Sequence, residues 1–166
     1  MRLRLFIIFF AFTSIYSTCS YTFKDVSITP DVKTAKVNYI DNRARFVNPQ
    51  LSPKLTDKLK QKIIGQTRLT LVNGDDAHYE ISGSVTDFSV TTSGISGQQV
   101  SSNNLNITVH VTFRNRLDES KNFETDITRN FPFSASVSFS DAQNQLLDDI
   151  VKNVTDDIFN KIFSNW

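Results

Sequence analysis

Alternating apolar and polar residues predict that the middle of the chain forms β-strands. The clearest case is residues 105–114, in which an apolar side chain occupies every second position. A period of two is typical of a strand with one buried face and one polar face. Weaker alternation predicts further strands at 33–40, 69–72, 78–92 and 123–127.

The connections between these strands are polar. Within 78–92 the apolar positions change phase after Val85, which predicts a β-bulge near Thr86 and Asp87. Residues 93–104 are rich in Gly, Ser, Gln and Asn, and are predicted to form the longest loop of the domain. Residues 116–121 are charged and are expected to form a hairpin tip.

A longer apolar period predicts two amphipathic helices. The first is expected to start at Ser52 and Pro53, a side-chain cap followed by a proline at the first helical position, and to stop at Gly65. The second runs from Ser140 to the end of the chain. Its apolar stripe, spaced by three or four residues, consists of Leu147, Ile150, Val151, Val154, Ile158 and Ile162.

The order of these elements defines the expected fold. A strand, a helix, three or four strands and a final helix predict an α+β domain over residues 33–166. We expect a two-layer sandwich, in which two amphipathic helices pack on one face of a mixed sheet of about four strands.

The first residues have the pattern of an export signal. Residues 1–18 combine a basic tip, a short apolar run and an exit of small and polar residues, and they lead directly to Cys19, the only cysteine. A cysteine at this position is typical of a bacterial lipoprotein, in which it becomes the lipidated first residue. The alternative is cleavage nearby, which leaves Cys19 as an unmodified thiol. Residues 19–32 are expected to form a tether and entry segment.

Charge is balanced overall but uneven along the chain. The chain has 18 Lys and Arg against 17 Asp and Glu. Basic residues dominate 33–68, whereas acidic residues dominate 140–166. This asymmetry suggests one surface that favours anions, with a merely solvated helix face as the alternative. The near-neutral total argues against a nucleic-acid partner.

No catalytic pattern is found in the sequence. His78 and His110 fall in predicted strands, without the Cys, His or Glu spacing of a metal site. Neither a nucleophile motif nor a phosphate-binding glycine loop is present. We therefore expect no enzyme activity and no cofactor.

Three stretches of the chain resemble the LptE family, the lipoproteins of lipopolysaccharide transport in Gram-negative outer membranes. The first is Tyr21-Thr22-Phe23 followed by the strand that includes 32–34. The second runs from 48–52 through Leu59 to 67–72, and the third is the ending, 157–166. Together with the order of elements, the resemblance spans essentially the whole mature chain, in the short single-domain form of the family.

The resemblance implies a non-enzymatic protein of the outer membrane, lipid-anchored on the periplasmic side. It would plug and help assemble the LptD β-barrel, and help deliver lipopolysaccharide to the outer leaflet. The candidate lipopolysaccharide-binding residues are the cations of the basic segment, Arg43, Arg45, Lys54, Lys58 and Lys62. The candidate barrel-contacting residues are the polar positions Gln98, Thr108, His110 and Thr112. The alternative is an accessory lipoprotein of another transport system with the same architecture.

We predict that Cys19 is lipidated, because it directly follows a short apolar leader. Since one acyl chain binds a membrane only marginally, several are expected at this residue. Metabolic labelling with a fatty-acid analogue should mark the wild-type protein and leave Cys19→Ser unmarked. Equal labelling of the two proteins, or labelling of neither, would contradict this assignment.

Overall fold

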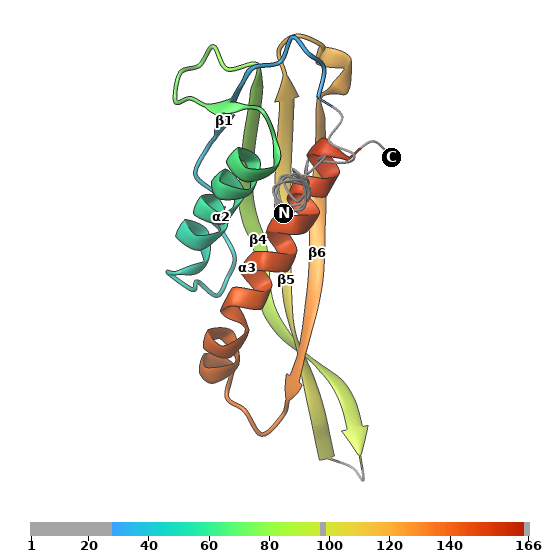
Figure 1. Ribbon diagram of the computed structural model, residues 1–166. Helices are drawn as coiled ribbons and strands as arrows, with labels where there is room; N and C mark the ends of the chain where they lie inside the picture. Colours follow the sequence, from blue (N-terminus) through green and yellow to red (C-terminus); the bar gives the residue numbers. More distant parts are fainter. Residues whose placement is uncertain (1–27, 97–98, 165–166) are drawn as a thin grey trace, which may run out of the picture.

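The computed structural model describes residues 28–96 and 99–164. The predicted signal peptide, Cys19 and Gln98 lie outside the described residues. The described part forms two layers, a sheet and a pair of helices (Figure 1). The expected α+β class is therefore confirmed.

The sheet is mixed and has six strands instead of about four. Its order is β3-β1-β4-β5-β6, and the short β2 also pairs with β4. The pairs of β1 with β3 and β4 are parallel, whereas β4, β5 and β6 form an antiparallel meander. The strands are β1 (Thr34–Val37), β2 (Asp41–Asn42), β3 (Thr70–Leu71), β4 (Tyr79–Ser96), β5 (Gln99–Asn115) and β6 (Phe123–Ser134).

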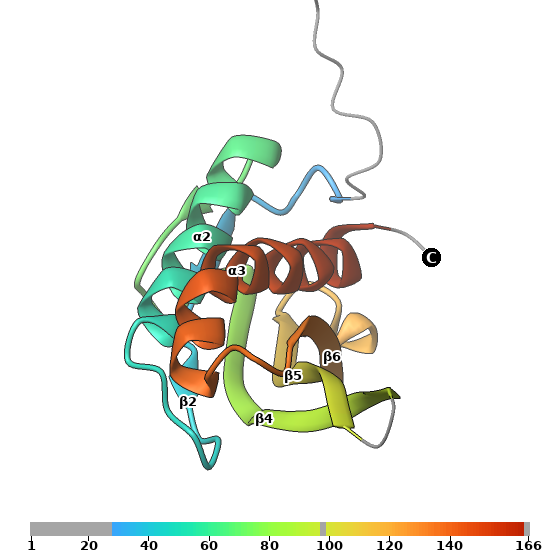
Figure 2. The ribbon, with the colours of Figure 1, turned by 90° about the horizontal axis from the view of Figure 1, so that it is seen from below.

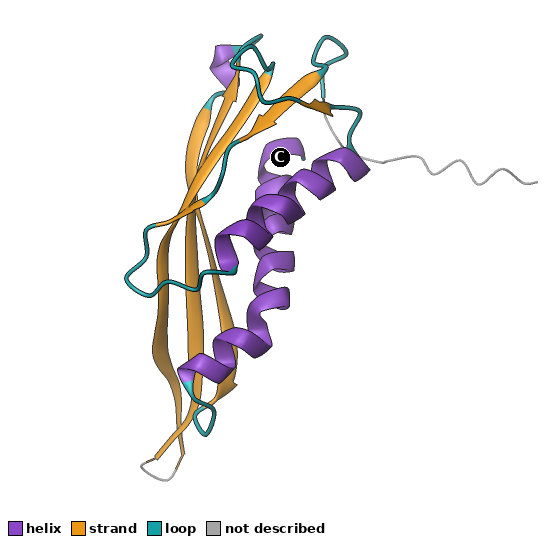
Figure 3. Cartoon of the chain, turned by 90° about the vertical axis from the view of Figure 1, so that its left-hand side faces the viewer, coloured by secondary structure: helices purple, strands orange, loops and turns teal. Residues whose placement is uncertain are grey.

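The expected loop at 93–104 is wrong, because β4 and β5 continue as a long hairpin. Pairing between the two strands extends from Tyr79 and Asn115 to Ser96 and Gln99. The end of the hairpin projects beyond the start of the last helix (Figures 1 and 3). Strand pairing uses backbone groups, so this segment needs no apolar alternation to form a ladder.

The predicted β-bulge is confirmed, with a shift of register between Val85 and Asp87. A bulge inserts one extra residue and so changes which side chains face the core. Val85 and Phe88 are both fully buried as a result, although they are three residues apart.

Both helices cover the same face of the sheet, as predicted (Figure 2). Helix α2 (Leu51–Gln66) contacts β1, β2 and β3, whereas α3 (Phe139–Phe163) contacts β5 and β6. A short 3-10 helix, η2 (Glu119–Lys121), occupies the predicted hairpin tip before β6.

The ends of α2 differ from the sequence prediction. The helix begins one residue before Ser52, and Gln50 stands at the cap position without a side-chain hydrogen bond. The Asn48 side chain instead accepts a hydrogen bond from the backbone N–H of Gln50, at 2.9 Å. At the other end the helix continues past Gly65, and the Thr67 hydroxyl donates to the carbonyl of Ile63. Side chains just outside the helix therefore replace the predicted Ser52 cap and glycine stop.

The apolar stripe of α3 lies against the sheet as predicted. Leu147, Ile150, Val151, Val154 and Ile158 are buried, and Ile162 is partly buried against the same core. Ser138 caps the first turn by accepting from the backbone N–H of Asp141. Burying each large aliphatic side chain contributes roughly 1.5–3 kcal/mol before entropy is subtracted.

We predict that Val154→Asp lowers the free energy of unfolding by several kcal/mol, about 3 or more. The residue is fully buried, so the new carboxylate would have no water and no partner. Lys152→Asp, two residues earlier on the exposed side of the helix, should cost little. Chemical denaturation of both variants is the measurement, and an equally mild effect of the two would contradict the packing of α3.

Candidate functional site: an open polar sheet face and a groove between the helices

The helices leave one face of the sheet uncovered (Figure 2). The side chains of this face are polar. In β5 the buried residues alternate with partly exposed polar ones, so the polar side chains point to the uncovered face. Register places His110 opposite Asp126 and Thr108 opposite Thr128, which extends the same chemistry to β6. The polar residues of β5 on this face are Asn104, Asn106, Thr108, His110, Thr112 and Arg114.

His110 stands in this face between two carboxylates. Its Nδ1 lies 2.8 Å from Asp126 Oδ1, and its Nε2 lies 3.7 Å from Glu124 Oε2. Both acids are exposed and belong to the neighbouring strand. No group of three potential metal ligands occurs in the described ranges. The contacts of His110 with Asp126 and Glu124 are therefore cross-strand pairs on a solvent-exposed surface.

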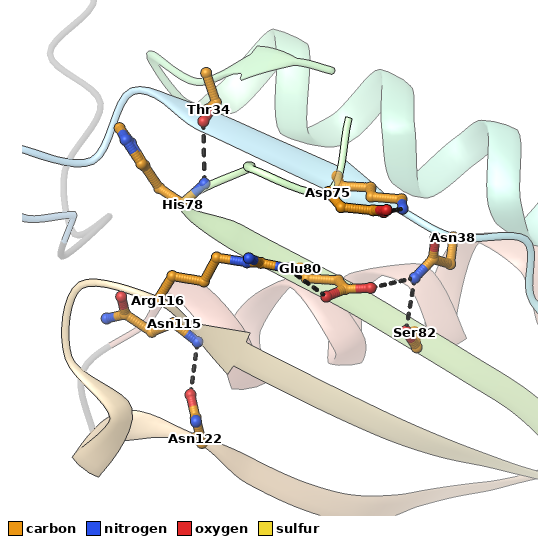
Figure 4. A network of polar contacts seen from close by, with 10 residues as sticks. Thr34, Asn38, Asp75, His78, Glu80, Ser82, Asn115, Arg116 and Asn122 are labelled. Atoms are coloured by element: carbon orange, nitrogen blue, oxygen red, sulfur yellow. Dashed lines mark hydrogen bonds and ion pairs between the residues drawn. The ribbon is translucent and has the colours of Figure 1, made fainter. Parts of the chain in front are cut away.

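A second polar network joins three parts of the sheet near the end of β1 and the start of β4 (Figure 4). The amide of Asn38 donates to Glu80 and to the Ser82 hydroxyl, each at 2.9 Å. Glu80 also faces Arg116, at 3.8 Å, from the turn after β5. Because its members come from three segments, the network ties the end of β1, the start of β4 and the turn after β5 together.

His78 lies at the same end of the sheet, and its ring forms a hydrogen bond with the backbone. Its ring Nδ1 accepts from the backbone N–H of Lys33, at 2.9 Å, and its own N–H donates to the Thr34 hydroxyl. The histidine therefore tethers the entry of β1 to the start of β4.

The basic side of α2 faces the acidic side of α3. Lys54 Nζ lies 2.8 Å from Asp148 Oδ1, and Lys62 Nζ lies 2.5 Å from Asp156 Oδ1. Each helix advances by eight residues between the two contacts, in the same direction, so the helices run parallel. The two segments of opposite charge thus partly neutralise each other, and Lys54 and Lys62 are engaged within the domain.

The ion pair with Lys54 changes the acidity of its partner. The hydrogen bond from Lys54, and secondly its charge, hold the pKa of the Asp148 carboxyl below its ordinary value. Lys36 has the same effect on the pKa of Asp75 through a hydrogen bond of 2.6 Å near the sheet edge.

The other candidate cations lie in two places. Arg43 and Arg45 are exposed in the loop between β2 and α2. The guanidinium of Arg45 lies 5.7 Å from the ring centre of Phe46, and Arg43 lies 3.5 Å from Asp41. Lys58 instead lines the groove between the helices. The structure therefore does not gather the five predicted cations into one site.

The groove between the helices contains a residue that the sequence analysis did not single out. Lys152 lines the same two hollows as Lys58, one of about 530 Å³ and one of about 450 Å³. The signal that could have indicated it is the shared eight-residue spacing of Lys54 with Lys62 and of Asp148 with Asp156. Within the described residues, neither α2 nor α3 is long and apolar enough to cross a membrane.

Comparison with known families gives one match. The model of the family described as "LptE: Lipopolysaccharide-assembly" matches residues 32–162, which include every helix and strand except the final residue of α3. No curated protein sequence matches the chain.

Solved structures of similar fold include bacterial lipoproteins of low sequence identity. A minor lipoprotein of Acinetobacter baumannii is 18% identical, with a TM-score of 0.50, over 78% of this chain and 90% of that one. Lipoprotein B of Nitrosomonas europaea is 15% identical, with a TM-score of 0.52, over 80% of this chain and 83% of that one. At such identities these neighbours support the fold alone.

We predict that Lys54→Gln returns the pKa of Asp148 toward its ordinary value, as measured by NMR titration of the carboxyl carbons. A carboxyl whose pKa is lowered by folding adds stability above its unfolded pKa, about 4, and loses it as the pH falls through the folded value. The variant should therefore lose less stability than the wild type on acidification.

Asp75 provides the internal control, because its cationic partner is Lys36. Lys54→Gln should leave the titration of Asp75 unchanged, and Lys36→Gln should shift Asp75 alone. An unchanged Asp148 titration in Lys54→Gln would show that the helices do not pair as described.

Proposed function

Because the chain belongs to the LptE lipopolysaccharide-assembly family, we propose that it plugs and helps assemble the LptD β-barrel. In this role it also helps deliver lipopolysaccharide to the outer leaflet. Family membership supports a lipopolysaccharide-assembly lipoprotein of the cell envelope. The barrel partner and the plugging role are the steps we add.

The proposed plugging role rests mainly on the uncovered, polar face of the sheet. A plug must meet the lumen of its barrel, and barrel lumens are polar where their outer walls are apolar. Thr108, His110 and Thr112 lie in a row on this face, and all three are partly exposed. Their hydroxyl and imidazole groups can exchange hydrogen bonds with a polar wall, with no apolar patch to desolvate.

The long hairpin of β4 and β5 supports the same proposal. It extends the polar sheet beyond the start of α3 (Figure 3). A paired β-ribbon is stiffer than a single loop, because its two backbones hold each other through hydrogen bonds. The hairpin therefore offers a second, elongated surface for the barrel wall. Gln98 lies between its two strands, outside the described residues.

Contacts with lipopolysaccharide are proposed for the cations that remain accessible. Arg43, Arg45 and Lys58 are exposed, and guanidinium and ammonium groups both bind phosphates and carboxylates. Lys54 and Lys62 already contact aspartates of α3, so their contribution to an external ligand would require these pairs to open.

Anchoring is proposed through Cys19 and the following tether, which connect the domain to the periplasmic side of the outer membrane. The described domain begins at Ile28, so only the short segment 20–27 separates it from the lipidated cysteine. Even fully extended, this connection spans about 30 Å. The domain would therefore stay close to the membrane surface, where a barrel plug has to be.

Site-specific photo-crosslinking tests the barrel partner. Crosslinkers at Thr108, Thr112 and Gln98 should each join the protein to one large β-barrel protein in outer-membrane preparations. Asn160, exposed on α3 in the opposite layer, reports whether the sheet face is preferred. We expect stronger crosslinking from the two threonines than from Asn160.

The outcomes separate the two candidate roles. Crosslinks only to small soluble proteins, or none from any position, would contradict the plug and favour an accessory role in another transport system. Crosslinks to a large barrel from Asn160 alone would keep the partner but assign the contact to the helix layer.

A further inference from the structure

Two ion pairs connect the parallel helices like the rungs of a ladder. Lys54 pairs with Asp148 at one level, and Lys62 pairs with Asp156 eight residues further along both helices. Residues four apart on a helix lie on the same face, one turn above each other. The level between the two rungs is therefore occupied by residue 58 of α2 and residue 152 of α3.

Both residues at the middle level are lysines. Lys58 and Lys152 line the same two hollows of the groove, so they face a shared space from opposite helices. Among the residues that the structure describes, neither ammonium group has an ion-pair partner. Like charges opposite each other are unfavourable, whereas an acid at either position would complete the ladder. The middle level is thus suited to an anion from outside.

The larger hollow supplies the rest of such a site. It has a volume of about 530 Å³, within the range of small-molecule sites. Three lysines and only one aspartate supply its charges, and two glutamine amides add neutral donors. The polar groups are Lys58, Lys62, Lys152, Asp156, Gln61 and Gln66.

Gly65, which is exposed, adds open space to this hollow. A Cβ atom built at this residue would meet no atom within 4 Å, so space remains above the last turn of α2. The single aspartate is already engaged, since Asp156 accepts from Lys62 at 2.5 Å. An anion entering the hollow would therefore meet Lys58 and Lys152 as its free cations.

The smaller hollow is a poorer candidate for an anion. It contains three lysines, Lys54, Lys58 and Lys152, but Asp57, Asp148 and Asp149 balance them with three negative charges. This balanced charge attracts an anion less than the three lysines and one aspartate of the larger hollow do. The ligand is thus expected in the larger hollow, between the middle level of the ladder and the C-terminal turn of α2.

We propose that the groove between α2 and α3 binds a phosphate group through Lys58 and Lys152. A phosphate offers several acceptor oxygens to two ammonium groups and two amides at once, which suits the mixture of donors in the hollow. The source is either free phosphate or a phosphorylated lipid headgroup. The second source rests on the proposed function in lipopolysaccharide assembly, whereas binding of the phosphate group does not.

Inorganic phosphate is the first probe. In NMR titrations at constant ionic strength, phosphate should shift the backbone amides of Lys58, Gln66 and Lys152 in the wild-type protein. Lys58→Glu should lose this binding by about tenfold or more, because an acid now occupies one side of the site. The same variant should unfold at a higher temperature without phosphate, since the introduced carboxylate can pair with Lys152.

The expected rise in unfolding temperature excludes misfolding of Lys58→Glu as the cause of weaker phosphate binding. A variant that is more stable and binds less phosphate cannot have lost binding through damage to the fold. Lys33→Gln, which removes an exposed cation that does not line this hollow, is the matched control and should bind phosphate like the wild type. Phosphate binding that is absent from the wild type, or equal in wild type and Lys58→Glu, would overturn the proposal.

Lipid A with and without its phosphate groups, in detergent micelles, identifies the source. Binding that needs both the lipid phosphates and Lys58 would assign the groove to a lipid headgroup. If lipid A binds equally well to the wild type and to Lys58→Glu, whereas inorganic phosphate binding depends on Lys58, the groove is assigned to free phosphate. Crosslinking to the barrel is independent of both results, so failure of the groove and failure of the plug are distinguishable.

Discussion

The whole arrangement depends on a sheet that has only one apolar face. Val109 and Val111 of β5 face the helices, whereas His110 between them faces outward. Apolar area is worth burying on one side only, so both helices must share that side. The helices consequently lie next to each other, and the other face of the sheet stays polar and open. Both surfaces to which we assign a role follow from this single asymmetry.

Two kinds of contact fix helix α3 on the apolar face of the sheet. Its apolar stripe is buried against β5 and β6. Arg129 of β6 also donates two hydrogen bonds to the Asp157 carboxylate of α3, of 2.5 and 2.6 Å. The register of α3 against the sheet is thus fixed by apolar packing and by one two-point ion pair. A fixed register matters for the groove, because a displacement of one turn would bring Asp148 opposite Lys58.

The sequence predicts those parts of the fold whose residues show a burial pattern. The strand at 105–114 and the stripe of α3 are recognisable because each alternates between core and water with the period of its own element. The hairpin beyond Thr92 resembles a loop in the sequence, since its strands pair through the backbone and display no such alternation. The predicted start of α2 is wrong because the Asn48 side chain, outside the helix, accepts a hydrogen bond from the backbone N–H of Gln50, the residue just before the helix.

The candidate sites are predictable to different degrees. Alternation within one strand assigns Thr108, His110 and Thr112 to a polar face, and they lie there. The engagement of Lys54 and Lys62 could not be foreseen from local pattern, because their partners are 94 residues away and meet them only if the helices run parallel. The eight-residue spacing on both helices is consistent with such a ladder, but spacing alone does not choose between a ladder and two solvated faces.

The position of β1 inside the sheet has a consequence for the order of folding. β1 is the first strand of the chain to be synthesised, yet its neighbours β3 and β4 come about 36 and 44 residues later. Strands β4, β5 and β6 can pair early through short connections, since local contacts close with little loss of chain entropy. Until β1 arrives, the Tyr79–Ile81 edge of β4 presents unpaired backbone groups to other chains. Before β1 is in place, pairing of this edge with another chain would compete with the insertion of the chain's own first strand.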